Sequence, residues 1–439
     1  MGLFNFKKTG RRTKSKIKKT RSVKSVIQSL GKGLYWGSSL GLAFYLGSQT
    51  PNFVTDQYLA RFPSEERKEF EEFTGGTKLF GKTEDVEGQK RGLFFTAEVI
   101  YKEQIVRDFE LDAVRVYSDD FWKNPILEQL RSIKEIQVGG MAWGDKIGLY
   151  GFGKPTIHHE IKHVKTNDIT KEDPDFLDKW AALATGEDGN SMYMDKRESK
   201  NYFARGERGE NIRDNNWPKD KLEENGFISG YARKNVLEDI AETCEQVEIA
   251  SSLLSSSLWE KRIINPDTKN KRFIAKIELA QEYSLIPKDF TEWVELKNFY
   301  DGLWGYNGYY GRNGIREEVI DSFIIKAEEF LEKNPDSYYE GTVLWHIGDT
   351  LLEKGWTDEN KREAAIAFTR SLSAKNKRDY FYSLTALERI YYRDQKFEKA
   401  EIIREAITEY HKREDEGDYS IITNGVNDFL VDNGIELYE

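Results

Sequence analysis

The segment HEIKH, from His159 to His163, constrains this chain more than any other stretch of its sequence. The chain has five histidines, and three of them, including His158, fall within six residues. On an α-helix, residues four positions apart lie on one face, so the imidazoles of His159 and His163 would point at the same spot. Two such nitrogens can share one tetrahedral zinc ion, and the adjacent Glu160 could act as general base toward a water molecule there. The spacing therefore predicts a zinc site on a helix.

The alternative for this motif is a surface helix with two solvated histidines, which the neighbouring Lys162 would suit. His158 is not expected to be a ligand. A zinc site needs a third protein ligand from further along the chain, and the turn that follows HEIKH contains no histidine.

The candidate for the third ligand lies in the segment GFISGYARKNVLEDIAETCEQ, residues 226–246. Tyr231 stands seven residues before Glu238, and Glu242 follows Glu238 by about one helical turn. With HEIKH, this spacing resembles the glutamate-zincins of the anthrax lethal factor type and related bacterial zinc metallopeptidase families, in which HExxH is followed by Y-x6-E-x3-E. The resemblance covers about residues 93–290 and is specific at these two short elements.

The resemblance implies an α+β zincin-like metallopeptidase domain that acts on a protein or peptide substrate. Its cofactor would be Zn²⁺, with His159, His163 and Glu238 as the three protein ligands.

The same resemblance implies roles for the remaining matched residues. Glu160 would activate the attacking water, and Tyr231 would donate a hydrogen bond to the oxyanion of the tetrahedral intermediate. Glu242 would accept a hydrogen bond from a ligand histidine and orient it. The alternative is that Glu238 and Glu242 belong to an exposed acidic helix face and that Tyr231 is an ordinary core residue.

Local patterns around these motifs predict alternating strands and helices. Residues 92–101 and 112–118 are rich in β-branched and aromatic side chains and are expected to be strands, as is the segment 146–153. Apolar residues at helical spacing predict helices over 121–136 and 236–259.

The sequence divides the chain further by composition. Residues 56–92 are polar and are expected to form a short helix and a loop spacer before the metallopeptidase domain, 93–305. Within that domain, residues 164–230 are polar and irregular, and a loop of that length is expected to be functional or partly structured. The glycine- and tyrosine-rich segment 306–314 marks the expected domain boundary.

Residues 306–439 are expected to form an all-α domain of helix pairs. The segment 383–407 resembles a tetratricopeptide repeat, with Phe397 and Ala400 in its second helix, and Ala365 stands 35 residues before Ala400. Such helix pairs form concave surfaces that can bind a protein partner. The alternative is a bundle of helical hairpins without repeats.

The N-terminus combines a basic tail with an uncharged segment. Residues 1–32 contain eleven Lys/Arg and no Asp/Glu, and residues 33–55 carry no charge. This order predicts a cytoplasmic tail followed by a membrane anchor or signal segment, with the remaining body outside the cytoplasm, or secreted if the segment is cleaved. The alternatives are a disordered basic tail with a short buried helix, or an organellar targeting segment.

Charge and cysteine content exclude other classes of protein. The residues after position 32 carry 55 basic and 76 acidic side chains, so the body has a net charge of −21 and is not expected to bind nucleic acid. Nucleic-acid binding by the basic tail alone is the alternative. The single cysteine, Cys244, excludes an intrachain disulfide and is expected to be buried.

These observations predict a membrane-anchored zinc metallopeptidase with a helical protein-interaction domain. The alternative is a catalytically inactive zincin-like adaptor with tetratricopeptide-like repeats that binds a protein partner.

Overall fold

The computed structural model describes residues 64–81, 86–116, 140–149, 153–194, 217–252, 270–304 and 317–437. Over these residues the chain is mostly helical, with one small sheet. None of the helices in these ranges has the length and apolar character needed to span a bilayer. The predicted anchor at 33–55 and the predicted helix at 121–136 lie outside the described residues.

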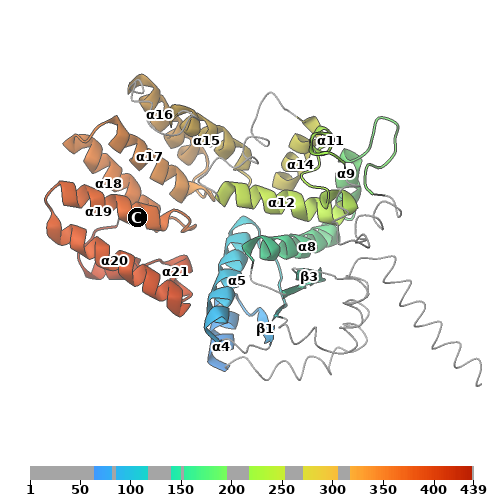
Figure 1. Ribbon diagram of the computed structural model, residues 1–439, viewed down its shortest axis with the longest axis horizontal. Coiled ribbons are helices and arrows are strands. Elements are labelled where there is room, and N and C mark those ends of the chain that lie inside the picture. The colour runs from blue at the N-terminus through green and yellow to red at the C-terminus, as the bar shows by residue number, and fades with distance from the viewer. Residues whose placement is uncertain are drawn as a thin grey trace, which may run out of the picture.

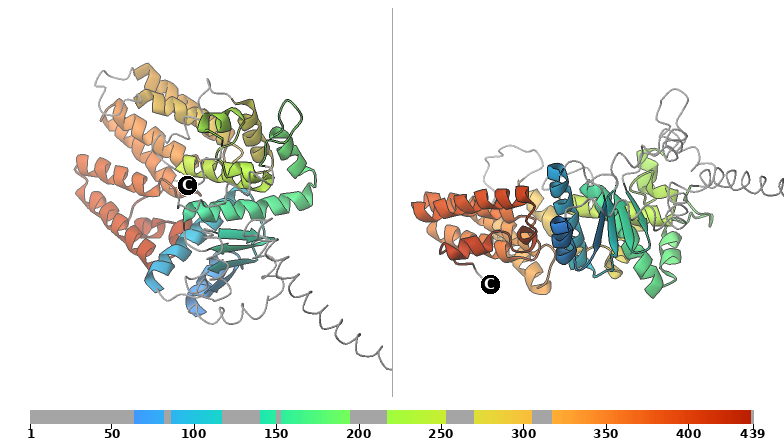
Figure 2. Two further views of the ribbon diagram at one scale, coloured as in Figure 1. Left: turned by 45° about the vertical axis from the view of Figure 1, so that its right-hand side comes forward. Right: turned by 90° about the horizontal axis from the view of Figure 1, so that it is seen from below.

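The sheet has four short strands in the order β1-β2-β4-β3. Strands β1 (Lys78–Gly81), β2 (Ala113–Val116) and β4 (Lys146–Leu149) are parallel, and β3 (Gly140–Trp143) pairs antiparallel with β4. Helix α8 (Lys154–Glu172), which carries HEIKH, lies across this sheet, as Figure 2 shows. A turn connects β3 to β4, and α8 begins shortly after β4, so one compact unit contains the edge of the described sheet and two of the candidate metal ligands, His159 and His163.

Each of the other helices lies either on the side of α8 that faces away from the sheet or beside the sheet (Figure 1). Helices α15 to α20 form a curved stack that begins beside α12 and ends next to α5. The elements are α4 (Ser64–Phe73), α5 (Val86–Val106), α9 (Phe176–Leu183), α11 (Lys219–Glu224), the short 3-10 helix η2 (Ala232–Lys234), α12 (Val236–Ser252), α14 (Lys271–Glu282), α15 (Phe290–Trp304), α16 (Glu317–Lys333), α17 (Glu340–Lys354), α18 (Asp358–Ser373), α19 (Tyr380–Arg393), α20 (Phe397–Glu416), α21 (Ser420–Thr423) and α22 (Asn427–Asp432).

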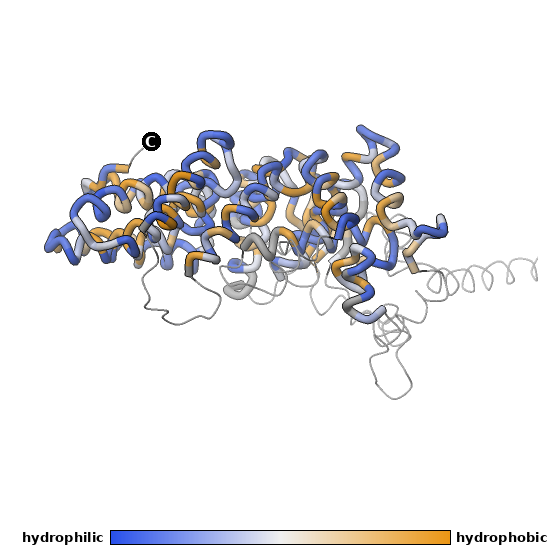
Figure 3. Tube along the Cα trace, turned by 90° about the horizontal axis from the view of Figure 1, so that it is seen from above, coloured by the Kyte–Doolittle hydropathy of each residue, from blue (hydrophilic) through white to orange (hydrophobic). Residues whose placement is uncertain are grey.

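Two main hydrophobic cores hold these layers together. One runs without a break from α9 and α12 through α14 and α15 into the stack, and it contains the buried Cys244. The other lies between α5, α8 and the sheet, and Ile421 and Ile422 of α21 complete it. Figure 3 shows hydrophobic residues between the helices and hydrophilic residues mainly on their outer turns. The end of the helical stack is thus packed onto the layer that contains the sheet.

The predicted strand at 92–101 is wrong, because these residues lie inside helix α5. Leu93, Ala97 and Ile100 are buried at intervals of four and three residues, which is the spacing of one helix face. Aromatic and β-branched side chains in this segment suggested a strand, but its apolar positions fit a helix that covers the sheet.

Residues 164–230 are more regular than predicted. Helix α8 continues to Glu172, and α9 follows with Phe176 and Trp180 fully buried in the core. Residues 195–216 of this segment lie outside the described residues. In the predicted spacer, the short helix is confirmed as α4, but the expected loop is wrong where β1 and the first residues of α5 lie.

The predicted strand at 112–118 is confirmed over Ala113–Val116 as β2, and the one at 146–153 is confirmed over Lys146–Leu149 as β4. The predicted helix that begins at 236 is confirmed as α12 up to Ser252. The expected boundary at 306–314 lies outside the described residues.

A buried cluster of charges joins α8 to α5. The carboxylate of Glu103 accepts hydrogen bonds from Lys162 Nζ and Lys165 Nζ, both at 2.7 Å, and lies 2.8 Å from His158 Nδ1. Glu103 is 1% exposed, and both lysines are fully buried. Burial alone would raise the pKa of Glu103, but the two ammonium groups outweigh it and hold that pKa well below its usual value. The cluster therefore fixes α8 in one position against α5.

We expect Glu103→Gln to lower the free energy of unfolding by about 3–5 kcal/mol, because it removes the carboxylate charge that both buried ammonium groups contact. Urea denaturation followed by circular dichroism measures this loss. The control is Glu172→Gln, which breaks a surface ion pair with Arg107 and should cost less than about 1 kcal/mol. Equal losses in the two variants would contradict a central role for Glu103.

Candidate metal centre

Helix α8 presents a different chemistry on each of its sides. Ile157, Ile161 and Val164 are fully buried in the core that includes the sheet. His159 and His163 lie on the opposite side, where α12 packs. Because one turn takes 3.6 residues, positions 159 and 163 point almost directly away from positions 157, 161 and 164. The apolar face therefore seats the helix on the sheet and turns both imidazoles toward α12.

Helix α12 begins in a way that places Glu238 opposite the histidines. Asn235 caps the helix, since its side-chain oxygen accepts hydrogen bonds from the backbone N–H groups of Leu237 and Glu238 at 2.9 and 3.1 Å. Glu238 thus lies in the first turn, where a carboxylate interacts favourably with the helix dipole. Glu242 follows one turn later on the same side.

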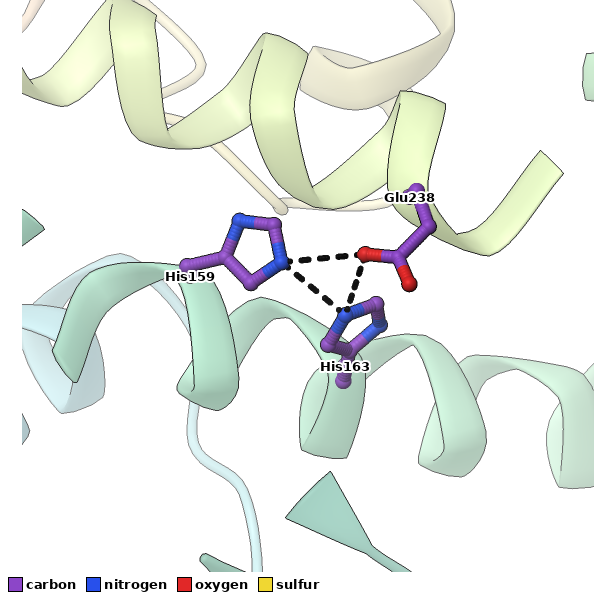
Figure 4. A group of neighbouring side chains, drawn as sticks. All are labelled: His159, His163 and Glu238. Carbon is purple, nitrogen blue, oxygen red and sulfur yellow. Dashed lines mark hydrogen bonds and ion pairs between the residues drawn. The ribbon is translucent and has the colours of Figure 1, made fainter. Parts of the chain in front are cut away.

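The structure brings His159, His163 and Glu238 together around one point (Figure 4). The Nε2 atoms of the two histidines are 3.2 Å apart. Glu238 Oε2 lies 3.2 Å from Nε2 of His159 and 3.4 Å from Nε2 of His163. Three donor atoms from two helices thus form a nearly equilateral triangle.

This triangle fits a tetrahedral zinc ion. Zinc–ligand bonds of about 2.0–2.1 Å at the tetrahedral angle place neighbouring ligand atoms about 3.3 Å apart. Two imidazoles and one carboxylate are also a ligand set found at catalytic zinc sites, where a fourth position stays open. His159, His163 and Glu238 could therefore hold the metal without rearrangement.

The alternatives with solvent-exposed side chains are wrong for these residues. His159, Glu160 and Glu238 are buried, with 9%, 6% and 2% exposure, and Lys162 is fully buried. Asp239, next to Glu238, is also fully buried and accepts hydrogen bonds from Trp180 and Tyr193. The motif therefore lies inside the protein.

Burial and nearby charges distribute protons unevenly between the two histidines. Burial opposes a charged His159, but hydrogen bonds to Glu238 and Glu245 outweigh it and raise its pKa well above the usual value. Burial and the neighbouring His159 lower the pKa of His163. In the metal-free protein His159 is therefore the protonated member of the pair. Binding of a metal at Nε2 would release that proton, so metal affinity should fall as the pH is lowered.

Glu160 lies beside the ligands, against strand β3. A Cβ atom added to Gly140 would come within 2.7 Å of Glu160 Cγ and 2.9 Å of Glu160 Oε1, so glycine leaves room for this carboxyl group. Burial, opposed by the charge of His159 and reinforced by Glu238, raises the pKa of Glu160 to about 8. A carboxyl group with a pKa near neutrality can take up and return a proton, as a general base must.

Tyr231 lies at the edge of the same group, with its ring centroid 6.1 Å from that of His159. Burial and the carboxylates of Glu238 and Glu160 raise its pKa, so its hydroxyl stays protonated. Lys234 Nζ donates to the Tyr231 hydroxyl at 3.1 Å and lies 2.5 Å from Glu238 Oε1. Sequence reasoning overlooked Lys234, although it stands one turn before Glu238.

The carboxylate closest to Nδ1 of His159 belongs to Glu245. Glu245 Oε2 is 3.0 Å from this nitrogen, whereas Glu242 Oε1 is 3.6 Å away and the other oxygen of Glu242 accepts a hydrogen bond from Ser229 at 2.7 Å. Glu238, Glu242 and Glu245 lie at positions i, i+4 and i+7 of α12, which share one helix face. That spacing could have identified Glu245 from the sequence.

We expect Glu245→Gln to weaken Zn²⁺ binding about tenfold or more, because His159 loses the anionic acceptor that orients its ring. Competition with a chromogenic chelator measures the affinity. Glu242→Gln is the matched control, one turn away on the same face, and should have the smaller effect. The reverse order would show that Glu242 orients the histidine.

No family model matches the chain, and no curated protein or solved structure matches it either. The likeness of its motifs to those of the glutamate-zincins therefore stays a prediction. At the site, two histidine nitrogens and a carboxylate oxygen face one another, and a buried carboxyl group lies beside them.

Proposed function

We propose that this chain is a zinc-dependent peptidase of the zincin type, with its active centre between α8 and α12. The observation that carries the proposal is the buried triangle of His159 Nε2, His163 Nε2 and Glu238 Oε2, with sides of 3.2, 3.2 and 3.4 Å. Glu160 and Tyr231 lie next to it. Peptide hydrolysis needs a proton acceptor and a hydrogen-bond donor, and these two side chains could supply them.

Zn²⁺ bound at this triangle would polarise the scissile carbonyl group and make a water molecule acidic near neutral pH. Glu160 would take a proton from the attacking water as its oxygen forms a bond to the carbonyl carbon. The same carboxyl group would then pass the proton to the peptide nitrogen as the C–N bond breaks. The products are a carboxylate and an amine.

Tyr231 would act on the oxyanion of the tetrahedral intermediate. Its hydroxyl stays protonated, so it can donate a hydrogen bond to an oxygen that gains negative charge. Strand β3 ends the described sheet next to Glu160, so an extended peptide could pair with its edge while the scissile bond lies over α8.

The remaining regions complete the proposal. Helices α16 to α20 would act as tetratricopeptide-like pairs that dock a protein partner or present a substrate. Residues 33–55 would anchor the protein in a membrane, with the peptidase outside the cytoplasm. The inactive adaptor is the rival function, and metal binding and hydrolysis separate the two.

We expect the purified full-length protein to bind one Zn²⁺ per chain, and His163→Ala and Glu238→Ala to lose most of it, because each removes one of three ligand atoms. Atomic absorption after dialysis measures the metal. His411→Ala is the control, since His411 is an exposed histidine on α20. Equal zinc in wild type and both ligand variants would contradict this site.

We expect Glu160→Gln to lower peptide hydrolysis about 10²–10⁴-fold while zinc stays bound, because the amide cannot accept the proton of the attacking water. Cleavage of a quenched fluorescent peptide library measures the activity. Glu172→Gln, at the exposed end of the same helix, should leave both activity and metal content unchanged. If Glu160→Gln cleaves as well as wild type, the mechanism is wrong.

A further inference from the structure

Lys234 places a cation inside the candidate metal centre. Its side chain is 8% exposed, and its ammonium group contacts both Glu238 and Tyr231. The resemblance of the sequence to glutamate-zincins assigns no role to this position. We propose that Lys234 is a positioning residue, which holds one oxygen of Glu238 and so makes Glu238 a one-oxygen ligand. This inference rests on the proposed function.

The two oxygens of Glu238 have different partners. Oε2 faces Nε2 of His159 and of His163, whereas Oε1 lies 2.5 Å from Lys234 Nζ. A carboxylate can bind a metal through one oxygen or through both. Because the ammonium group occupies Oε1, Glu238 would supply one ligand atom and the fourth tetrahedral position would stay open for the reaction.

The contact with Tyr231 sets the direction of a hydrogen bond. An ammonium group donates hydrogen bonds and cannot accept them, so the Tyr231 oxygen is the acceptor in its 3.1 Å contact with Lys234 Nζ. The hydroxyl hydrogen must therefore point to another acceptor, and Glu238, whose hydrogen bond helps to raise the Tyr231 pKa, is one. Lys234 and Tyr231 thus both contact the Glu238 carboxylate and hold it in place.

Local structure explains how Lys234 reaches both groups. It ends the 3-10 helix η2, three residues after Tyr231, and Asn235 then caps α12. Tyr231, Lys234 and Glu238 thus follow one another at intervals of three and four residues, which places them on one side of the chain.

The test compares full-length wild type with Lys234→Met and Lys234→Gln, each loaded with Co²⁺ in place of Zn²⁺. Four-coordinate Co²⁺ absorbs visible light more strongly than five-coordinate Co²⁺. Without the ammonium group, Glu238 can bind through both oxygens, so we expect weaker absorption in both variants. Lys234→Arg should restore most of the absorption, since its guanidinium group can donate to the same carboxylate oxygen. Lys171→Met, which removes an exposed lysine from α8, is the control.

Hydrolysis provides the second measurement. We expect Lys234→Met to lower kcat more than it changes KM, because a second Glu238 oxygen at the metal would leave less room for the reacting water. Circular dichroism shows that the variants are folded.

The outcomes separate two failures. If wild type binds Co²⁺ and the Lys234 variants match it in spectrum and kcat, the role of Lys234 is wrong and the zinc site stands. If wild type binds neither Co²⁺ nor Zn²⁺, the proposed function is overturned, and the role of Lys234 with it.

Discussion

The packing of helix α8 against the sheet, α5 and α12 is the constraint on which the site depends. Its apolar face lies on the sheet, Glu103 of α5 pairs with its two buried lysines, and α12 covers the side with the histidines. A helix held in this way cannot rotate or slide without exposing charges to an apolar interior, which costs several kcal/mol per charge. His159 and His163 are thereby kept in register with Glu238, which comes from a different helix.

The same burial shapes the electrostatics of the site. Carboxylates that would be ordinary at a surface acquire shifted pKa values here: burial raises the pKa of Glu160, whereas the histidines and Lys234 lower that of Glu238 despite burial. One carboxyl group is thus suited to carry a proton and the other to carry a negative charge toward a cation. Two chemically identical side chains therefore acquire different proposed roles, because their neighbours differ.

The sequence predicted part of this arrangement. HEIKH, Tyr231 and Glu238 were identified from helical spacing and from a resemblance, and the structure places them together. Glu245 and Lys234 were overlooked, although both lie at helical intervals from Glu238, because carboxylates and lysines are common on helices and spacing alone does not show which are buried. The segment 92–101 was misread, because aromatic and β-branched residues also suit a helix that is buried against a sheet.

The sequence by itself determined that two imidazoles share one helix face and that a glutamate begins a second helix, since both follow from local backbone geometry. Only the tertiary structure decided that these faces meet, with three ligand atoms 3.2 to 3.4 Å apart. The two faces meet through contacts between residues about 80 positions apart. These contacts arise because α12 packs on α8 and α8 packs on the sheet. Spacing along the sequence determines which residues share a helix face, and packing between distant segments determines which of these faces form one site.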